Sequence, residues 1–161
     1  MNIFYHQAAL SSYKKYCSIT NLIQKGEKMR ITKIEGIGPV YGAKLNRAGI
    51  NTTEKLLIAA ANRKDRQKLA EQTGIPEKNI LEWINRADLM RINGVGEEYS
   101  DLLEAAGVDT VKELRTRNAE NLYQTLITTN SSKKLVRRIP SLSKVRHWIE
   151  IAASLEPVVT H

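Results

Sequence analysis

The stretch that decides the fold is IEGIGPVYGAKLNRAGI, residues 34–50, because a copy of it occurs later in the chain. The copy is INGVGEEYSDLLEAAGV, residues 92–108, at a constant offset of 58 residues. Both contain a Gly-x-Gly pair, a tyrosine, a leucine and an Ala-Gly ending, and a threonine and a leucine follow each. A repeat of this length without a gap indicates that one supersecondary unit is duplicated.

Each copy predicts a helix, a tight turn and a second helix. In the first copy, Gly36 and Gly38 permit the backbone angles of a very short turn, and Ile37 between them points into the core. Pro39 suits the first position of the following helix, which Gly49 ends. The two repeats are expected to cover residues from about 31 to 86 and from about 87 to 156.

Further helices follow each turn. The spacing predicts a helix over residues 63–73, closed by Gly74. Trp83 and Trp148 share apolar faces of two later helices, which favours core packing over stacking on nucleic-acid bases. The period-two alternation of a half-buried strand is absent, so the predicted class is all-α.

Residues 1–28 have no counterpart in the repeat and form a short N-terminal extension, expected to be helical or disordered. Met29 stands directly before the repeat region. One hypothesis is that Met29 is the true start and that the preceding residues are an upstream extension of the reading frame. Mass spectrometry of the native protein tests it, because peptides from residues 1–28 would contradict it.

The 161 residues carry a formal charge of +8 and a pI of about 9.6. This charge makes polyanions plausible partners, although a basic average is also compatible with a merely soluble surface. The charge is unevenly distributed along the chain. Residues 87–114 hold seven carboxylates against two Lys and Arg, whereas residues 115–161 hold eight Lys and Arg against three carboxylates.

Few side chains support enzyme chemistry. Cys17 is the single cysteine, so it can form neither an intramolecular disulfide nor a cysteine metal site. His6, His147 and His161 are too scattered for a zinc site or a catalytic triad. We therefore expect a non-enzymatic protein without metal or cofactor. The absence of a long apolar run predicts no membrane segment, and a cytoplasmic location is expected.

The glycine pattern resembles the helix-hairpin-helix motif of DNA repair, recombination and replication proteins. The first copy carries it as residues 36–39 followed by Lys44-Leu45, and the second as residues 94–96. Residues 31–159 are further similar to an uncharacterised bacterial domain family of tandem helix-hairpin-helix units that shares the core ADLMRIxGVGEEY, here residues 87–99. The resemblance implies two tandem hairpins packed as a compact helical domain over residues 29–161. It implies no activity.

A Gly-x-Gly turn that opens a helix presents backbone N–H groups without helical partners, and a phosphate oxygen can dock there. Such contacts fix position without reading sequence. Val40 occupies a position where many DNA-binding members of the motif carry lysine. The predicted nucleic-acid-binding residues are those of the first turn and the cations around it: Lys33, Gly36, Ile37, Gly38, Val40, Tyr41, Lys44 and Arg47.

The second copy differs in charge, because Glu97, Glu98, Asp101 and Glu104 lie on and after its turn. Carboxylates near a helix N-terminus stabilise the helix but repel a phosphate. This hairpin is therefore expected to pack against the first copy or to meet a basic protein partner. Such a cluster of carboxylates is more often a solvated helix face than a metal site.

The densest basic stretch lies near the C-terminus. It is either a secondary nucleic-acid surface or a solvated helix face, and the sequence favours neither. Its members are Lys133, Lys134, Arg137, Arg138, Lys144 and Arg146.

Two functions follow from these patterns. The leading hypothesis is a module that contacts the backbone of DNA, or of RNA, through the first hairpin. The alternative is a protein-interaction or scaffold module that uses the acidic second hairpin. An enzyme has the least support, since no nucleophile-base pair, metal spacing or P-loop occurs.

Overall fold

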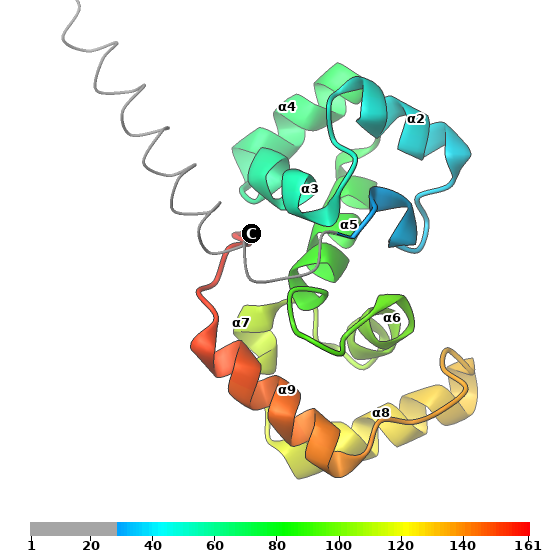
Figure 1. The fold of residues 1–161 in the computed structure, drawn as a ribbon, viewed down its shortest axis with the longest axis vertical. Coiled ribbons are helices and arrows are strands. Elements are labelled where there is room, and N and C mark those ends of the chain that lie inside the picture. Colours follow the sequence, from blue (N-terminus) through cyan, green and yellow to red (C-terminus); the bar gives the residue numbers. More distant parts are fainter. Residues whose placement is uncertain (1–28) are drawn as a thin grey trace, which may run out of the picture.

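The structure, a computed structural model, describes residues 29–161, and every regular element in that range is a helix (Figure 1). The elements are η1 (Ile31–Lys33), α2 (Pro39–Arg47), α3 (Thr53–Ala60), α4 (Arg63–Thr73), α5 (Glu77–Leu89), α6 (Glu97–Ala105), α7 (Val111–Leu114), α8 (Ala119–Lys133) and α9 (Leu142–Ser154). The predicted all-α class is confirmed. The expected extension over residues 1–28 and the question of the start at Met29 fall outside the described residues.

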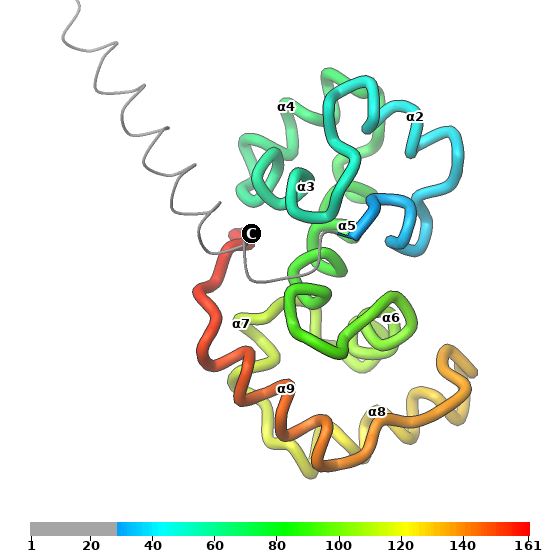
Figure 2. The backbone as a smooth tube through the Cα atoms, viewed as in Figure 1, coloured from blue at the N-terminus to red at the C-terminus, as the bar shows by residue number. Residues whose placement is uncertain are grey.

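Two hydrophobic clusters organise these helices. The first gathers buried side chains from η1 to α5, and the second gathers those from the end of α5 to α9. Helix α5 serves both, because Ile80 and Ile84 lie in the first cluster and Leu89, its last residue, lies in the second. In Figures 1 and 2 the clusters form the upper and lower halves, with α5 running from one into the other. Burial of apolar surface thus holds each half together and α5 connects them.

The segment before the turn differs between the copies. In the second copy it is the 13-residue helix α5, but in the first it is only the three-residue helix η1. The helix expected before the first turn is this short, because the chain entering η1 is extended against the start of α3. The N–H of Ile31 donates to the carbonyl of Asn51, and the N–H of Thr53 donates to that of Met29, both at 3.0 Å.

The duplication extends beyond the turns into the helix caps. Helices α3 and α7 start after Thr52 and Thr110, whose hydroxyl oxygens each accept the backbone N–H three residues on at 3.3 Å. Helices α4 and α8 start after Asn62 and Asn118, which cap in the same manner. These side chains satisfy N–H groups that a helix start otherwise leaves unpaired. Helix α4 has the predicted bounds and ends, as expected, at Gly74.

Helices α5 and α9 are also equivalent. Trp83 lies seven residues after the N-cap of α5, Pro76, and Trp148 lies seven residues after the N-cap of α9, Ser141. The sequence spacing from proline to tryptophan differs by one residue because Ser141 is inserted before the helix. The indoles are 2 % and 1 % exposed, which confirms core packing and excludes base stacking in this conformation.

The C-terminal tail returns to the first half. After α9 ends at Ser154, Val159 packs into the first cluster, and the N–H of Thr160 donates to the carbonyl of Ala61 at 3.0 Å. The buried guanidinium of Arg66 donates to the carbonyls of Ala61 and Thr160, at 2.9 Å each. The halves are therefore connected twice, by α5 and by the tail.

A buried carboxylate supports the second turn. Asp88 accepts the guanidinium of Arg91 at 2.6 Å and the backbone N–H of Val111 at 2.9 Å. Arg91 also donates to the carbonyl of Glu156, at 3.1 Å. Burial raises the pKa of Asp88 even though Arg91 counteracts it. This cluster joins the end of α5, the start of α7 and the tail.

Candidate nucleic-acid interface

The two Gly-x-Gly turns share one backbone conformation. Their first glycines, Gly36 and Gly94, both have a φ of 87°, in the left-handed region that favours glycine. Between the glycines, Ile37 and Val95 are buried, and their N–H groups donate to the carbonyl three residues earlier at 3.1 and 2.9 Å. The predicted tight turn with an inward apolar side chain is confirmed in both copies.

A tryptophan packs beneath each turn. A Cβ atom on Gly36 would lie 3.1 Å from Nε1 of Trp83, and one on Gly94 would lie 3.4 Å from Nε1 of Trp148. Both glycines therefore also allow close approach of the indole. Each indole also packs against a tyrosine of the following helix, with ring centroids 5.2 Å apart in both pairs, Tyr41–Trp83 and Tyr99–Trp148.

The second glycine of each turn has no such internal role. Gly38 and Gly96 are the N-caps of α2 and α6, with φ of −76° and −94°, which any residue adopts. A Cβ atom at either position would meet nothing within 4 Å. Neither the backbone nor the packing demands glycine there. Its effect is to leave the main chain at the helix start open to approach from outside.

The start of α2 offers donors at this opening. The carbonyl of Gly38 accepts the N–H of Gly42 at 2.8 Å and begins the helix. The N–H groups of Gly38, Val40 and Tyr41 make no backbone hydrogen bond within residues 29–161. Pro39 contributes no N–H, so these three groups are the donors at the turn.

The predicted cations of the first copy do not all surround this turn. Lys44 lies 6.0 Å from the centroid of the Tyr41 ring, and its Nζ reaches the carbonyl of Gly74 at 3.4 Å. Lys44 and Arg47 together line a notch of about 240 Å³ beside the end of α4. Lys33 is exposed on η1, before the turn. The turn itself presents Val40, an aliphatic side chain that is 70 % exposed.

The four acidic residues of the second copy divide into two pairs. Asp101 and Glu104 face α5, where Arg86 binds them through Nε and an Nη atom at 2.8 and 2.6 Å. Burial raises the pKa values of both carboxyl groups, and the attraction of Arg86 only partly opposes it. This pair belongs to the packing of α6 against α5. Glu97 and Glu98 form no ion pair among residues 29–161.

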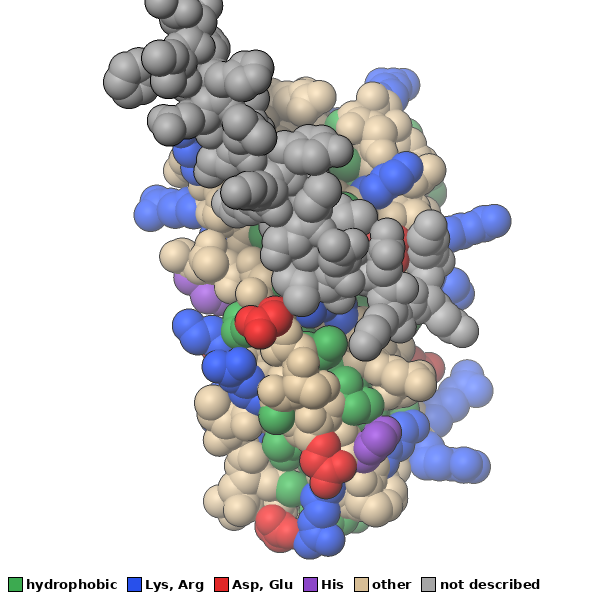
Figure 3. Space-filling view, turned by 60° about the vertical axis from the view of Figure 1, so that its left-hand side comes forward, with side chains coloured by type: hydrophobic (Ala, Val, Ile, Leu, Met, Phe, Trp, Pro, Cys, Tyr) green, Lys and Arg blue, Asp and Glu red, His purple; other side chains and the backbone are tan. Residues whose placement is uncertain are grey.

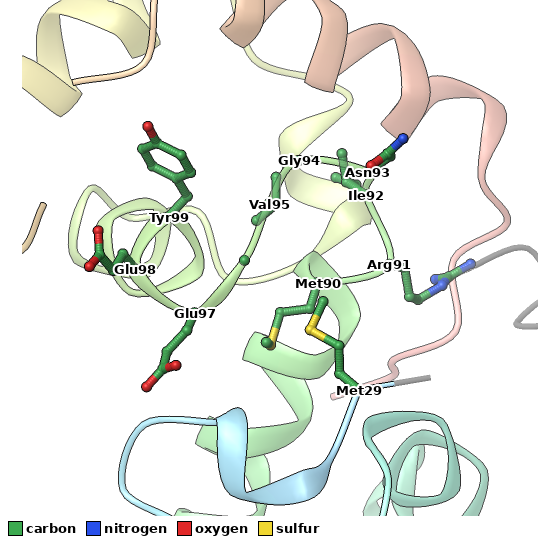
Figure 4. Close-up of a pocket in the computed structure, with 11 residues that line it drawn as sticks. Met29, Met90, Arg91, Ile92, Asn93, Gly94, Val95, Glu97, Glu98 and Tyr99 are labelled. Atoms are coloured by element: carbon green, nitrogen blue, oxygen red, sulfur yellow. The ribbon is translucent and has the colours of Figure 1, made fainter. Parts of the chain in front are cut away.

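Glu97 and Glu98 lie beside a groove of about 610 Å³ where the two halves meet (Figure 4). Its walls are Met29 and residues 90–99. In Figure 4, Met29 and Met90 lie together at its floor, Glu97 points toward the first half, and Glu98 points away. The groove therefore combines sulfur-containing apolar side chains with an acidic rim.

The C-terminal basic residues are also divided by the structure. Arg146 pairs with Glu120 of α8. Lys144 lies instead over two aromatic rings, 4.8 Å from the centroid of Tyr99 and 5.6 Å from that of Trp148. Lys133, Lys134, Arg137 and Arg138 are exposed at the end of α8 and in the connection to α9. Figure 3 shows Lys and Arg side chains projecting from both halves of the molecule.

A known family covers both turns. The domain of unknown function DUF4332 matches residues 35–155. The chain belongs to the DUF4332 family. The matched residues include both turns and α9, but the DUF4332 description names no helix-hairpin-helix motif, so that assignment stays a prediction. No solved structure matches the chain. In the described part of this DUF4332 protein, no helix is long and apolar enough to span a membrane.

Three features of this DUF4332 protein were missed by sequence reasoning. The pairing of Arg86 with the acidic hairpin, the position of Lys144 on Tyr99, and the return of the tail to Arg66 all join residues far apart in the chain. Of these three, only the position of Lys144 could have been inferred from the sequence, through the register of α9. Aligning Trp148 with Trp83 places Lys144 one turn before the tryptophan, on the side that faces the second hairpin.

Proposed function

We propose that this protein is a non-enzymatic binding module that contacts the backbone of DNA, or less readily of RNA, through its first hairpin and without reading sequence. The turn of residues 36–38 and the start of α2 would hold a phosphate group. The expected affinity is micromolar at physiological salt, on the order of other non-specific contacts.

The observation that carries the proposal is the open glycine at position 38. Its backbone angles are ordinary and a Cβ atom there would touch nothing, so packing gives no reason for glycine, and a helix N-cap takes serine, threonine, asparagine or aspartate at least as well. A glycine at such a site allows another molecule to approach the main chain closely. The molecule that the site suits is an anion, because the N–H groups of Val40 and Tyr41 make no backbone hydrogen bond within residues 29–161 and the positive end of the α2 dipole lies there.

The cations of α2 support the choice of a polyanion over a single ion. Lys44 and Arg47 lie along the helix that begins at the turn, and Lys33 precedes it. A nucleic-acid backbone presents phosphates in series, so one can dock at the turn while neighbours interact with these side chains. Helix α2 contains no carboxylate that would oppose them.

Fluorescence anisotropy with a labelled duplex over a salt series tests the proposal. Gly38→Ala should weaken binding because its methyl group obstructs the turn, and Lys44→Glu should weaken it and lower the salt slope by about 1. Lys64→Glu is the matched control, since it makes the same charge change at an exposed residue near the start of α4, whereas it is the other end of α4, at Thr73, that borders Lys44 and Arg47. Absence of binding at low salt, or equal losses for Lys44→Glu and Lys64→Glu, would contradict the proposal.

A protein partner is the second candidate function, and the groove at the second turn is the observation that favours it. Its acidic rim and its methionine floor suit a segment that is both basic and apolar. Because Arg86 holds Asp101 and Glu104 against α5, Glu97 and Glu98 are the carboxylates that would recognise such a partner. A partner captured by the wild type and lost with Glu97→Gln and Glu98→Gln, but retained with Lys44→Glu, would favour this function over nucleic-acid binding.

A further inference from the structure

Each hairpin places one lysine over its tyrosine ring, but the two lysines come from different helices. In the first hairpin Lys44 belongs to α2 itself and lies 6.0 Å from the centroid of Tyr41. In the second, Lys144 belongs to α9 and lies 4.8 Å from the centroid of Tyr99. The duplicated position of Lys44 is occupied by Leu102, which is buried. Both turns therefore have a lysine beside them, but in the second turn this lysine comes from α9 instead of from the helix that follows the turn.

Lys144 also borders the turn itself. Its Cε would lie 3.6 Å from a Cβ atom on Gly94. The indole N–H of Trp148 faces the same glycine, is 1 % exposed as a residue, and donates to no group among residues 29–161. A Cβ atom on the next glycine, Gly96, would meet nothing within 4 Å, as at Gly38, although Gly96 is half-buried and Gly38 is exposed. The second turn thus combines an unused buried donor, an accessible main chain and a cation.

The connection between α8 and α9, which carries further positive charge, contacts α6. The hydroxyl of Tyr99 donates to the carbonyl of Arg138 at 3.2 Å, which fixes the connection between α8 and α9 against α6. None of the cations in this group forms an ion pair within the described residues. We call them the α9 basic surface: Lys133, Lys134, Arg137, Arg138 and Lys144.

The neighbouring acids oppose this surface only in part. Arg86 binds Asp101 and Glu104 on the side of α6 that faces α5. Glu97 and Glu98 are the remaining carboxylates at the start of α6, against five cations. The charge of residues 87–114 is strongly negative in the sequence, but folding brings Lys144 against its turn.

We propose that the second turn and the α9 basic surface form a second contact site for the same nucleic-acid backbone that the first hairpin holds. The inference rests on the proposed function and makes its ligand more specific. A ligand that engages both turns must be a continuous polyphosphate chain, long enough to reach from α2 to the connection between α8 and α9 (Figure 1). Two linked contacts bind such a chain more tightly than either contact alone.

Charge reversals on α9 distinguish a specific contact at Lys144 from an attraction that depends only on the net charge of the protein. Lys144→Glu should weaken binding to a duplex of about 20 base pairs roughly tenfold and lower the salt slope by about 1. Arg146→Glu makes the same charge change two residues along α9, where the side chain already pairs with Glu120, and should change binding little. Circular dichroism checks folding, and Lys144→Gln serves in place of Lys144→Glu if the charge reversal does not fold.

Ligand length gives an independent test. A duplex of about 6 base pairs is too short to engage both turns, so losing either Lys44 or Lys144 should change its affinity by no more than about twofold, since the other turn remains available. Equal losses for Lys144→Glu and Arg146→Glu on the long duplex, with Lys44→Glu still effective, would overturn this inference and leave the proposed function intact. No binding by the wild type would end both. Competition by polyglutamate as strong as by a single-stranded DNA of equal charge would overturn it in favour of an acidic protein.

Discussion

The two hairpins have the same backbone and core but different charged surroundings. Both have a glycine with φ of 87°, a buried apolar residue in the turn, and a tyrosine packed on a tryptophan at 5.2 Å. In the first, Lys44 comes from the hairpin itself; in the second, the nearby cations come from α5 and α9. The repeated sequence thus specifies geometry, and the rest of the chain specifies which groups surround it.

The largest effects should come from the shared core. Trp83→Ala and Trp148→Ala should each lower the free energy of unfolding by about 3–5 kcal/mol, because both remove a fully buried indole. Urea unfolding followed by circular dichroism measures the loss. A cost below about 1 kcal/mol for one of them would show that the halves are not equivalent in their packing.

The same variants report on the connection between the halves. Each leaves a single tryptophan, whose fluorescence follows the half that was not altered. Because α5 and the tail with Arg66 and Val159 join the clusters, the fluorescence and circular dichroism transitions should coincide. Separate transitions would mean that one half remains folded after the other has unfolded.

Replacing the two glycines of one turn by alanine should change the free energy of unfolding by different amounts, and this difference should exceed the one between equivalent glycines of the two turns. Gly36→Ala should cost about 1–3 kcal/mol of stability, because φ is 87° there and Nε1 of Trp83 is 3.1 Å from the new methyl group. Gly38→Ala should cost about 1 kcal/mol or less, since nothing is within 4 Å of the new methyl group and only the preference of a helix N-cap for glycine over alanine is lost. Chemical denaturation of both variants decides this. A large loss of stability for Gly38→Ala would remove the argument that its glycine serves a ligand.

The sequence predicted most of this fold because its main signals are local. Glycine turns, Pro39 at a helix start, and the closure of α4 at Gly74 depend on neighbouring residues, and all three are observed. The sequence predicted a helix before the first turn but not its extent, and hydrogen bonds from Ile31 and Thr53 to distant carbonyls leave only the three-residue η1 there. Local periodicity carries no information about such contacts.

The candidate site was less accessible to sequence reasoning. The four acids of the second hairpin look like one surface, yet Arg86 binds two of them from another helix. Likewise, Lys144 and Arg146 look alike in a basic run, but one lies on aromatic rings and the other pairs with Glu120. Charge is additive along a sequence, whereas its effect at a site depends on which side chains folding brings together.

A substitution at position 40 should raise the affinity of the first hairpin for DNA. Val40 is 70 % exposed at the start of α2, so Val40→Lys should leave the free energy of unfolding nearly unchanged. The added cation beside the open turn should raise affinity for duplex DNA by several-fold and increase the salt slope by about 1. Anisotropy at two or more salt concentrations measures both. The equivalent change on α6, Glu98→Lys, is the comparison. If Glu98→Lys alone raised the affinity for duplex DNA, the second hairpin and not the first would be the main contact.

The smallest expected effect concerns pH, and it separates the hairpins because only the second has buried acids. Burial raises the pKa values of Asp101 and Glu104 above 3.8 and 4.5, while the matching residues of α2, Ala43 and Asn46, do not titrate.

The folded state therefore binds protons at these carboxyl groups more tightly than the unfolded state does. Their contribution to the free energy of unfolding falls as the pH rises from the ordinary carboxyl range through the raised pKa values, and is constant above them. The combined variant Asp101→Asn, Glu104→Gln should show a weaker fall between about pH 4 and pH 7 in urea unfolding. The difference should be below the ~1 kcal/mol of a typical substitution, because Arg86 offsets much of the cost of burial. A steeper fall in the variant than in the wild type would mean that Arg86, not burial, dominates these two pKa values.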